Sequence, residues 1–414
     1  MRRLTILLSA LIALHNVSAQ TSLEEYVSAV SEASIALERS HLDIEARQWS
    51  ATRSGKELLP ELLFDRTATI DFRHRDVGRA WSWATKFEAR QTIYSGGALR
   101  AQQRRAELEH RMAQERLRLV MREVRREAER RYWRLSHAVL YRGSMHYYTH
   151  IVETLREVIL RRYEEGYSAK GDLLQIESRL GEVRYQLSEA EEAYLVALHD
   201  YNSLCDKPLE TPAELSNSIT EQLPLPQRAA LSSVIESHPE HHIALLEAES
   251  RRWHVREVSA EYLPQIDIRA YTTLEPRYPH TATSGLHLGA GAMLGVSTPI
   301  FHFGERRAAT ESARAEQLAR EVEIEECERA ITLAEGDAWT LVMRTNERIV
   351  ALERSLEIAS ENLELSTFAY NEGETSLLDV MQAQISWLQT YKNYLAAHLD
   401  YALAVAQYSY VTED

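Results

Sequence analysis

The densest group of metal-ligating side chains in the sequence is the segment SHPEHH at 237–242. Its histidines, His238, His241 and His242, belong to the residue type that most often binds transition metals. The same segment also fits an ordinary helix start, because Pro239 is suited to the first helical position. We favour the helix start and expect no metal site here.

No catalytic motif accompanies these histidines. The sequence contains no phosphate-binding glycine loop, no HExxH zinc motif and no GxSxG nucleophile motif. Carboxylates are frequent, but nothing places two of them at a shared cleft for acid–base work. Cys205 and Cys327 form neither a CxxC redox motif nor a disulfide framework. We therefore expect neither an enzyme nor a cofactor.

The charge of the chain argues against a nucleic-acid partner. The 414 residues carry a formal net charge of −15 at pH 7, and such a balance disfavours contact with a phosphate backbone. The segment 100–134 is rich in arginine, but glutamates are interleaved with those arginines. We interpret this segment as a solvated helix surface covered by salt bridges.

The first residues have the pattern of a secretory signal peptide. Arg2 and Arg3 give a basic start, residues 4–14 form a short apolar run, and small residues follow at 17–19. We predict that residues 1–19 are a signal peptide and that the chain is exported. No cysteine stands at the cleavage point, so a lipid anchor is not expected. No later stretch reaches the roughly 20 apolar residues of a membrane-spanning helix.

The second half of the sequence repeats the first. YEEGYSAKGDLLQIE at 163–177 and YNEGETSLLDVMQAQ at 370–384 share five residue types at a constant offset of 207 positions. TIYSGGALRA at 92–101 matches PIFHFGERRA at 299–308 with the same offset. A motif order written twice predicts two copies of one structural unit.

Each copy contains two segments in which apolar and polar residues alternate, as in strands with one apolar face. These segments predict strands at about 61–73, 80–93, 265–274 and 285–298. Alternation alone leaves open a soluble, half-buried sheet. Export and the aromatic residues at the strand ends favour strands that cross a membrane. The lipid-facing residues would be Phe64, Ile70, Trp81, Trp83, Ile268, Leu286, Leu288 and Leu294.

Long stretches without proline predict long helices. No proline lies between Pro60 and Pro208, and none follows Pro299. Apolar residues recur there at the three- and four-residue steps of coiled coils. We predict two helical hairpins, each of which turns at one of the repeated tyrosine–glycine segments. The predicted organisation is a repeat 1 at 20–207 with a helical hairpin at about 98–205, a linker at 208–230, and a repeat 2 at 231–414 with a helical hairpin at about 305–408.

Four strands cannot close a membrane barrel by themselves. An open strand edge in lipid leaves backbone groups unpaired at a cost of several kcal/mol each, and a barrel needs at least about eight strands. Four strands per chain therefore demand at least two chains.

The order of these features resembles the TolC-type outer membrane factors of bacterial efflux and type I secretion systems. That order is a signal peptide, a helix that ends at Leu-Pro, a strand pair, a glycine turn, a long helix, a Tyr-x-x-Gly tip and a return helix. The Leu-Pro pairs are Leu59-Pro60 and Leu263-Pro264, and the whole order occurs twice. The resemblance covers nearly the whole mature chain.

The resemblance implies a homotrimer in the outer membrane. Three chains of four strands each would supply a twelve-stranded barrel, and the helices would continue it as a coiled-coil tunnel through the periplasm. The channel would act as the passive exit duct of a tripartite efflux or type I secretion system. Its tips would dock on a periplasmic adaptor, the membrane fusion protein, that is joined to an inner membrane pump of RND or ABC type.

The resemblance also assigns a constriction to the repeated turns. In this family, tip aspartates form a ring, and a tyrosine and an arginine near the second turn hold it closed. Asp172, Tyr370 and Asp379 stand at matching positions. Thr375 replaces the expected arginine, and Gln382 replaces the second ring carboxylate. The closing network is then weaker or built differently, and a plain helix-start role for the two aspartates stays open.

The repeated turns have a local structural role as well. We expect Gly166 and Gly373 to end the descending helices, and Ser168 or Thr375 to cap the returning ones. The adaptor-docking turns implied by the resemblance are Gly166, Tyr167, Ser168, Gly373 and Glu374.

Two other hypotheses fit parts of the sequence. A soluble periplasmic coiled-coil scaffold or adaptor would also have long helical hairpins, but typically one per chain. A degenerate family member that no longer docks or opens is the other hypothesis, and the altered gate positions Thr375 and Gln382 keep it open.

Overall fold

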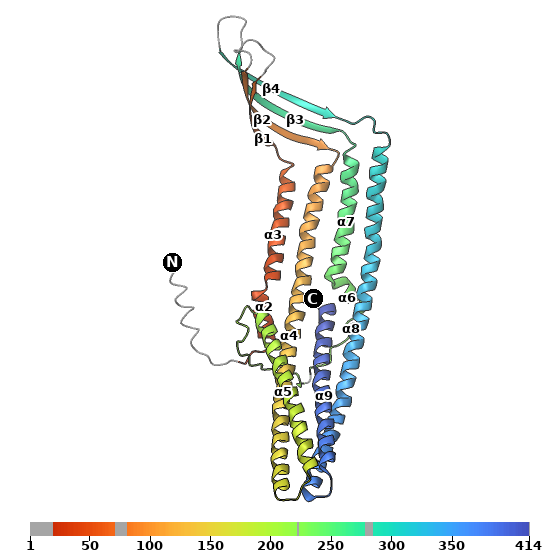
Figure 1. The fold of residues 1–414 in the computed structure, drawn as a ribbon. Helices are drawn as coiled ribbons and strands as arrows, with labels where there is room; N and C mark the ends of the chain where they lie inside the picture. The colour runs from red at the N-terminus through yellow and green to blue at the C-terminus, as the bar shows by residue number, and fades with distance from the viewer. Residues whose placement is uncertain (1–19, 71–80, 222, 278–284, 414) are drawn as a thin grey trace. The chain divides into compact units, whose positions relative to one another are not determined.

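The computed structural model of the protein describes residues 20–70, 81–221, 223–277 and 285–413. The predicted signal peptide, residues 1–19, lies outside the described residues, as do the side chains of Ile70 and Trp81. The described elements are, in chain order (Figure 1), α2 Leu23–Ala33, α3 Ile35–Lys56, β1 Glu61–Ile70, β2 Trp81–Ser95, α4 Ala98–Glu164, α5 Lys170–Leu204, α6 Leu231–Ser237, α7 Pro239–Ala260, β3 Gln265–Arg277, β4 Gly285–Ser297, α8 Glu305–Glu372 and α9 Leu377–Thr412.

The two longest helices occupy the proline-free stretches. α4 has 67 residues and α8 has 68, and α5 and α9 return beside them after short turns. The segment SHPEHH starts a helix as expected, because Pro239 is the first residue of α7. Nearby, His241 pairs with Glu328 and His242 pairs with Glu115, each at 3.3 Å. No group of three metal-ligating side chains forms in the described part of the chain.

The four strands form one antiparallel sheet in the order β1-β2-β3-β4. The central pair joins the two sequence repeats, because β2 belongs to the first repeat and β3 to the second. Register shifts between Thr92 and Tyr94, where β2 carries a bulge near its end. The outer edges of β1 and β4 have no strand partner among the described residues.

Directly opposed residues in this register share a face of the sheet. Phe64 lies opposite Phe87, Ala89 lies opposite Ala270, and Ile268 lies opposite Leu294, so these six residues form one apolar face. The other face is polar and carries the ion pairs Lys86–Glu88, Arg90–Glu61 and Arg269–Asp267. The alternation in the sequence thus produces a sheet with one apolar and one polar face.

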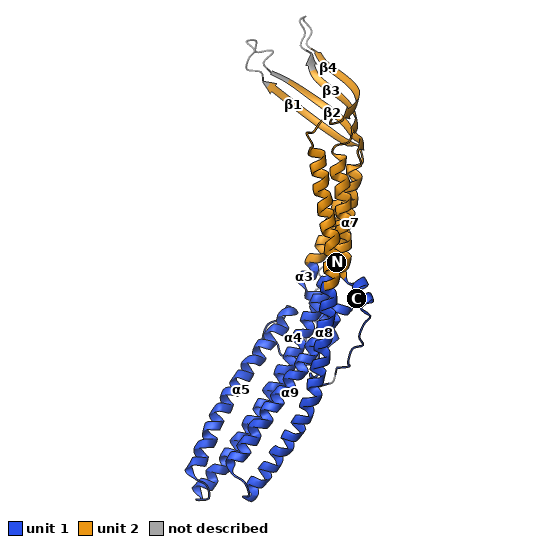
Figure 2. Ribbon diagram, turned by 90° about the vertical axis from the view of Figure 1, so that its right-hand side faces the viewer, with its two compact units in different colours: residues 1–38, 119–238, 330–414 blue, residues 39–118, 239–329 orange. Residues whose placement is uncertain are grey.

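The chain divides into two compact units (Figure 2). The first unit contains residues 1–38, 119–238 and 330–414, and the second contains residues 39–118 and 239–329. Each unit therefore combines segments from both sequence repeats.

Aromatic and aliphatic side chains from both helical hairpins fill the core of the first unit. One cluster includes Ile159 of α4, Ile176 of α5 and Val380 of α9, all buried. A second cluster is built on stacked tyrosines, with the Tyr26 and Tyr201 ring centroids 4.0 Å apart. The segment after α5 packs onto this cluster, since Ile219 in the predicted linker is buried within it.

Ion pairs cover the helices at the arginine-rich segment. The interpretation of residues 100–134 as a salt-bridged helix surface is confirmed, because glutamates three positions away pair with several of its arginines. The pairs include Arg104–Glu107, Arg118–Glu115, Arg126–Glu123 and Arg130–Glu127. Within the described residues, none of the helices combines the length and apolar character that crossing a membrane requires.

Candidate functional site

The two repeated turns end their helices with glycine in the left-handed region. Gly166 has φ of 82° and Gly373 has φ of 79°. Such a residue lets the next N–H groups bond back to the last helical carbonyls. Accordingly, the Tyr167 N–H donates to the Arg162 carbonyl at 2.7 Å, and the Glu374 N–H donates to the Ala369 carbonyl at 2.8 Å. The predicted helix ends are confirmed.

The returning helices begin differently from the prediction. The cap of α9 is Ser376, whose hydroxyl accepts from the Asp379 N–H at 3.3 Å, so Thr375 is not the cap. In α5 the cap position is occupied by Ala169, which has no side-chain acceptor, so Ser168 is not the cap either. The capping hydroxyl must lie at the residue directly before the first helical residue, and both predicted residues stand one position too early.

The two tip aspartates bind the starts of their own helices. The Asp172 carboxylate accepts from the Ser168 hydroxyl at 2.9 Å and from the Ala169 N–H at 3.3 Å. The Asp379 carboxylate accepts from the Thr375 hydroxyl at 2.7 Å and from the Ser376 hydroxyl at 2.6 Å. The helix-start role that the sequence left open is therefore present in both repeats.

These bonds change the electrostatics of Asp379. Hydrogen bonds from the Ser376 hydroxyl, then from the Thr375 hydroxyl and the Ser376 N–H, stabilise the carboxylate and lower the pKa of Asp379 below its ordinary value. Asp379 is exposed, as is Gln382, which lies less than one helical turn further along α9. Thr375, which stands where the family pattern has an arginine, thus reinforces the charge of Asp379.

Tyr370 contacts an arginine that the sequence pattern does not indicate. The Arg162 guanidinium carbon lies 5.1 Å from the centroid of the Tyr370 ring, and Tyr370 is buried. This distance is within the range of a cation–π interaction. The contact joins the last turn of α4 to the last turn of α8. The only sequence signal was the pair Arg161–Arg162 before the first turn, and nothing in its spacing indicates Tyr370 as a partner.

A groove lies beside this contact. Its volume is about 860 Å³, and it is lined by residues of α4, α8 and α9. Tyr147, Phe368 and Trp387 contribute aromatic side chains to the lining. Tyr167 protrudes from the first turn, with 81% of its surface exposed. The predicted docking-turn residues Gly166, Gly373 and Glu374 are also exposed, whereas Ser168 is partly buried. The tips thus offer a concave apolar surface beside exposed turns.

The sheet is the second candidate site, because its apolar face is exposed in the single chain. Leu62 is 82% exposed and Leu288 is 73% exposed. Of the predicted lipid-facing residues, Phe64, Ile268, Leu286, Leu288 and Leu294 are exposed, and Trp83 is half-buried. A contiguous apolar face of this kind requires a cover, either protein or lipid.

Comparison with known proteins agrees with this geometry. The family model described as "Outer membrane efflux protein" matches residues 27–200 and 230–408. No curated protein matches the chain. Because the family model covers most of its length, the chain belongs to the outer membrane efflux protein family.

Solved structures with the same fold are distant in sequence. A membrane protein from Pseudomonas aeruginosa is 16% identical with a TM-score of 0.83, over 94% of this chain and 92% of that chain. CusC is also 16% identical with a TM-score of 0.83, over 96% and 93% of the two chains. The outer membrane protein VceC from Vibrio cholerae is 14% identical with a TM-score of 0.77, over 94% and 95%.

The class of protein follows from these findings. The chain is an outer membrane efflux channel protein, mainly helical with a small antiparallel sheet, and its TolC-type fold confirms the predicted fold class. Its location is the outer membrane with the helices in the periplasm. The family is one of transport channels.

Proposed function

We propose that three copies of this chain form one channel that serves as the passive exit duct of a tripartite efflux or type I secretion system. The observation that carries the proposal is the open, four-stranded sheet with an exposed apolar face. In lipid, the unpaired edges of β1 and β4 need partners. Three sheets of four strands would pair every edge in one twelve-stranded barrel, with the apolar face outward.

The duct has no energy source or chemistry of its own in this proposal. We infer that the chain catalyses no reaction and uses no cofactor, and that a partner pump drives transport. The partner would be an inner membrane pump of RND or ABC type, reached through a periplasmic adaptor. The groove beside Phe368 and Trp387 and the exposed Tyr167 support docking at the tips, because apolar grooves receive amphipathic helices.

The gate would lie at the same tips. Asp172 and Asp379 would supply carboxylates to the constriction, with Gln382 and Thr375 at the remaining gate positions. The contact between Arg162 and Tyr370 would hold the ends of α4 and α8 together in the closed state. Arg162 would thus serve in place of the arginine that is missing at Thr375.

The rival hypothesis of a soluble periplasmic scaffold or adaptor is disfavoured. Such a protein would not leave Leu62, Phe64 and Leu288 exposed on one face of an open sheet. The degenerate-channel hypothesis is weakened as well, because Thr375 is integrated with Asp379 and Tyr370 has an arginine partner.

The proposal can be tested by mass. The measurement is the protein mass of the particle that mild detergent extracts from isolated outer membranes. We expect three chains per particle, because that number gives the barrel twelve strands. A monomer in the membrane extract, or recovery only in the soluble fraction, would leave the strand edges unpaired and would contradict the duct.

A further inference from the structure

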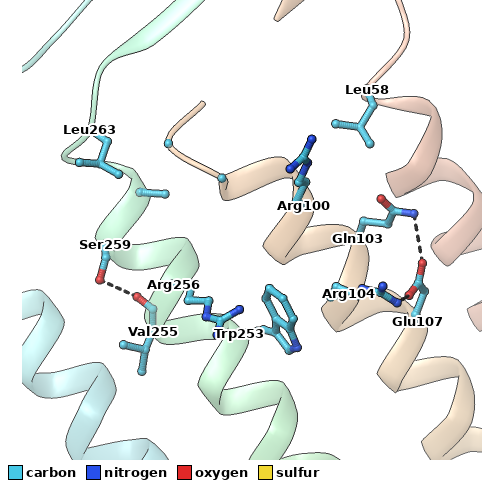
Figure 3. Close-up of a pocket in the computed structure, with 13 residues that line it drawn as sticks. Leu58, Arg100, Gln103, Arg104, Glu107, Trp253, Val255, Arg256, Ser259 and Leu263 are labelled. Atoms are coloured by element: carbon cyan, nitrogen blue, oxygen red, sulfur yellow. Dashed lines mark hydrogen bonds and ion pairs between the residues drawn. The ribbon is translucent and has the colours of Figure 1, made fainter. Parts of the chain in front are cut away.

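A basic cavity lies in the second unit next to the sheet (Figure 3). Its volume is about 720 Å³. Its lining comes from Leu58 after α3, from the first turns of α4 and from the last turns of α7. Gly96, which directly follows β2, and Leu263, which precedes β3 by two residues, also line it. The cavity is therefore tied by sequence to the ends of the two central strands.

Positive charge dominates the lining. Arg100, Arg104 and Arg256 contribute three guanidinium groups, against the single carboxylate of Glu107. That carboxylate is already occupied, because Arg104 donates to it at 2.6 Å and the Gln103 amide donates to it at 3.1 Å. The cavity thus keeps more positive than negative charge.

Two of the guanidinium groups have no carboxylate partner among the described residues. The Arg256 guanidinium stacks on the Trp253 ring, with its carbon 4.3 Å from the ring centroid, and the edge that carries the N–H groups is not engaged by an acid. Arg100 is exposed, and no ion pair involves it within the described ranges. Free guanidinium forks match the geometry of phosphate oxygens.

Arg100 lies at the start of a helix. It is the third residue of α4, whose first turn contains no acidic residue. The start of a helix already carries partial positive charge, so an arginine there is unfavourable without an anion. In the second repeat, Arg307 is the counterpart of Arg100. There α8 begins with Glu305, so its first turn contains an acidic residue that offsets the positive charge.

A hydrogen bond links the apolar face of the sheet to a residue that lines the cavity. Gln91 lies opposite Ile268 and therefore shares the apolar face. The Gln91 amide donates to the carbonyl of Leu58, whose side chain lines the cavity. A Cβ on Gly96 would approach the Ala260 carbonyl oxygen to 2.7 Å, so this glycine allows the turn between β2 and α4 to lie close to the end of α7. Trp253 is of the type enriched where membranes meet water.

We propose that this cavity binds the phosphate group of a phospholipid whose acyl chains lie along the apolar face of the sheet. The inference rests on the proposed function in one respect, which is that the apolar face is in contact with lipid. The free guanidinium groups would hold the headgroup phosphate by charge-assisted hydrogen bonds. The lipid would anchor the chain at the edge of the membrane where its strands give way to helices.

The test uses the intact particle extracted in mild detergent and stripped of lipid. Native mass spectrometry then measures binding of phosphatidylglycerol, phosphatidylethanolamine or inorganic phosphate, in the wild type and in the double variant Arg100→Gln with Arg256→Gln. We expect the wild type to bind phosphatidylglycerol, and the double variant to bind it about tenfold or more weakly. The control is Arg307→Gln, which removes one positive charge at the position of repeat 2 equivalent to Arg100 and should leave binding unchanged.

The outcomes separate the inference from its alternatives. Equal lipid affinity in the wild type and the double variant would overturn it. If inorganic phosphate binds as tightly as phosphatidylglycerol, the ligand is a free phosphate and the lipid assignment is wrong. A particle of three chains that binds no lipid would overturn this inference alone, whereas a chain absent from the membrane would overturn the duct as well. Thermal unfolding verifies that each variant is folded.

Discussion

Asp379 combines two roles at the scale of a single residue. Its carboxylate accepts from the hydroxyls of Thr375 and Ser376, and the residue stays exposed at the tip. Because these bonds stabilise the ionised form, the pKa of Asp379 lies below its ordinary value. The same carboxylate therefore stabilises the helix start and carries a negative charge, and the two roles are compatible.

We expect the contribution of Asp379 to cation selectivity to survive mild acid. Its pKa is lower in the folded state than in the unfolded state. The stabilisation of the helix start by the charge is therefore fully present above the unfolded pKa and is lost as the pH falls through the folded pKa. The measurement is the reversal potential of the channel in a planar bilayer at neutral pH and near pH 5, compared with Asp379→Asn. If the difference between wild type and variant vanishes already near pH 5, the assignment of this charge to the pore is wrong.

The two repeats differ at the scale of the helix start. Ser376 and Ala169 occupy equivalent cap positions with nearly the same backbone, φ −85° and ψ 158° against φ −76° and ψ 150°. One helix thus has a capping hydroxyl and the other lacks it, although both have the aspartate three residues later. The chain contains its own matched comparison of a capped and an uncapped tip.

Exchanging the caps should have opposite effects on the two tips. Ser376→Ala should destabilise the start of α9 by about 1 kcal/mol, and Ala169→Ser should stabilise the start of α5 by a similar amount. Hydrogen exchange of the first-turn amides measures both changes, and each variant serves as the control for the other helix. Slower exchange in α9 after Ser376→Ala would refute the assigned cap.

The sheet makes a prediction at the same scale. Leu288→Lys places a charge on the apolar face, whereas His287→Lys places it on the polar face of the same strand. A lysine facing lipid costs roughly 2–4 kcal/mol near the bilayer midplane and less toward its edges, so the first variant should reduce the amount of heat-resistant oligomer. Gel analysis of unheated membrane extracts provides the measurement. Equal yields from the two variants would mean that the apolar face does not contact lipid.

At the scale of the whole molecule, the repeats are interleaved. β2 of the first repeat pairs with β3 of the second, and both compact units draw on both halves of the chain. The tips are likewise joined across repeats, through Arg162 of α4 and Tyr370 of α8. A change at one tip contact should therefore affect how both hairpins move when the channel opens.

Arg162→Ala should make the closed channel easier to open. The substitution removes a cation–π contact worth about 0.5–2 kcal/mol. In a channel of three chains, the closed state would lose three such contacts. Single-channel recording should then show longer open periods or a higher conductance, while Arg161→Ala, at the exposed neighbour, should behave as wild type. Unchanged gating in Arg162→Ala would leave this contact a purely structural one.

Much of this protein could be predicted from the sequence, because its main signals are periodic and local. The alternation at Phe64 or Leu288 decides which face of a strand is apolar, and the glycines at the tips are needed for a left-handed turn. The pattern written twice predicts two hairpins without any knowledge of how they meet. Such signals act within a few residues, where sequence spacing fixes geometry.

The tertiary structure alone decided the contacts between segments far apart in the chain. The register of β2 against β3, the Arg162–Tyr370 contact and the cavity of Arg100 with Arg256 each join residues that no spacing rule connects. Even the caps were predicted one residue too early, because the exact first residue of a helix depends on the conformation of the preceding turn. Packing of distant elements, rather than local propensity, determines these contacts and hence the candidate sites.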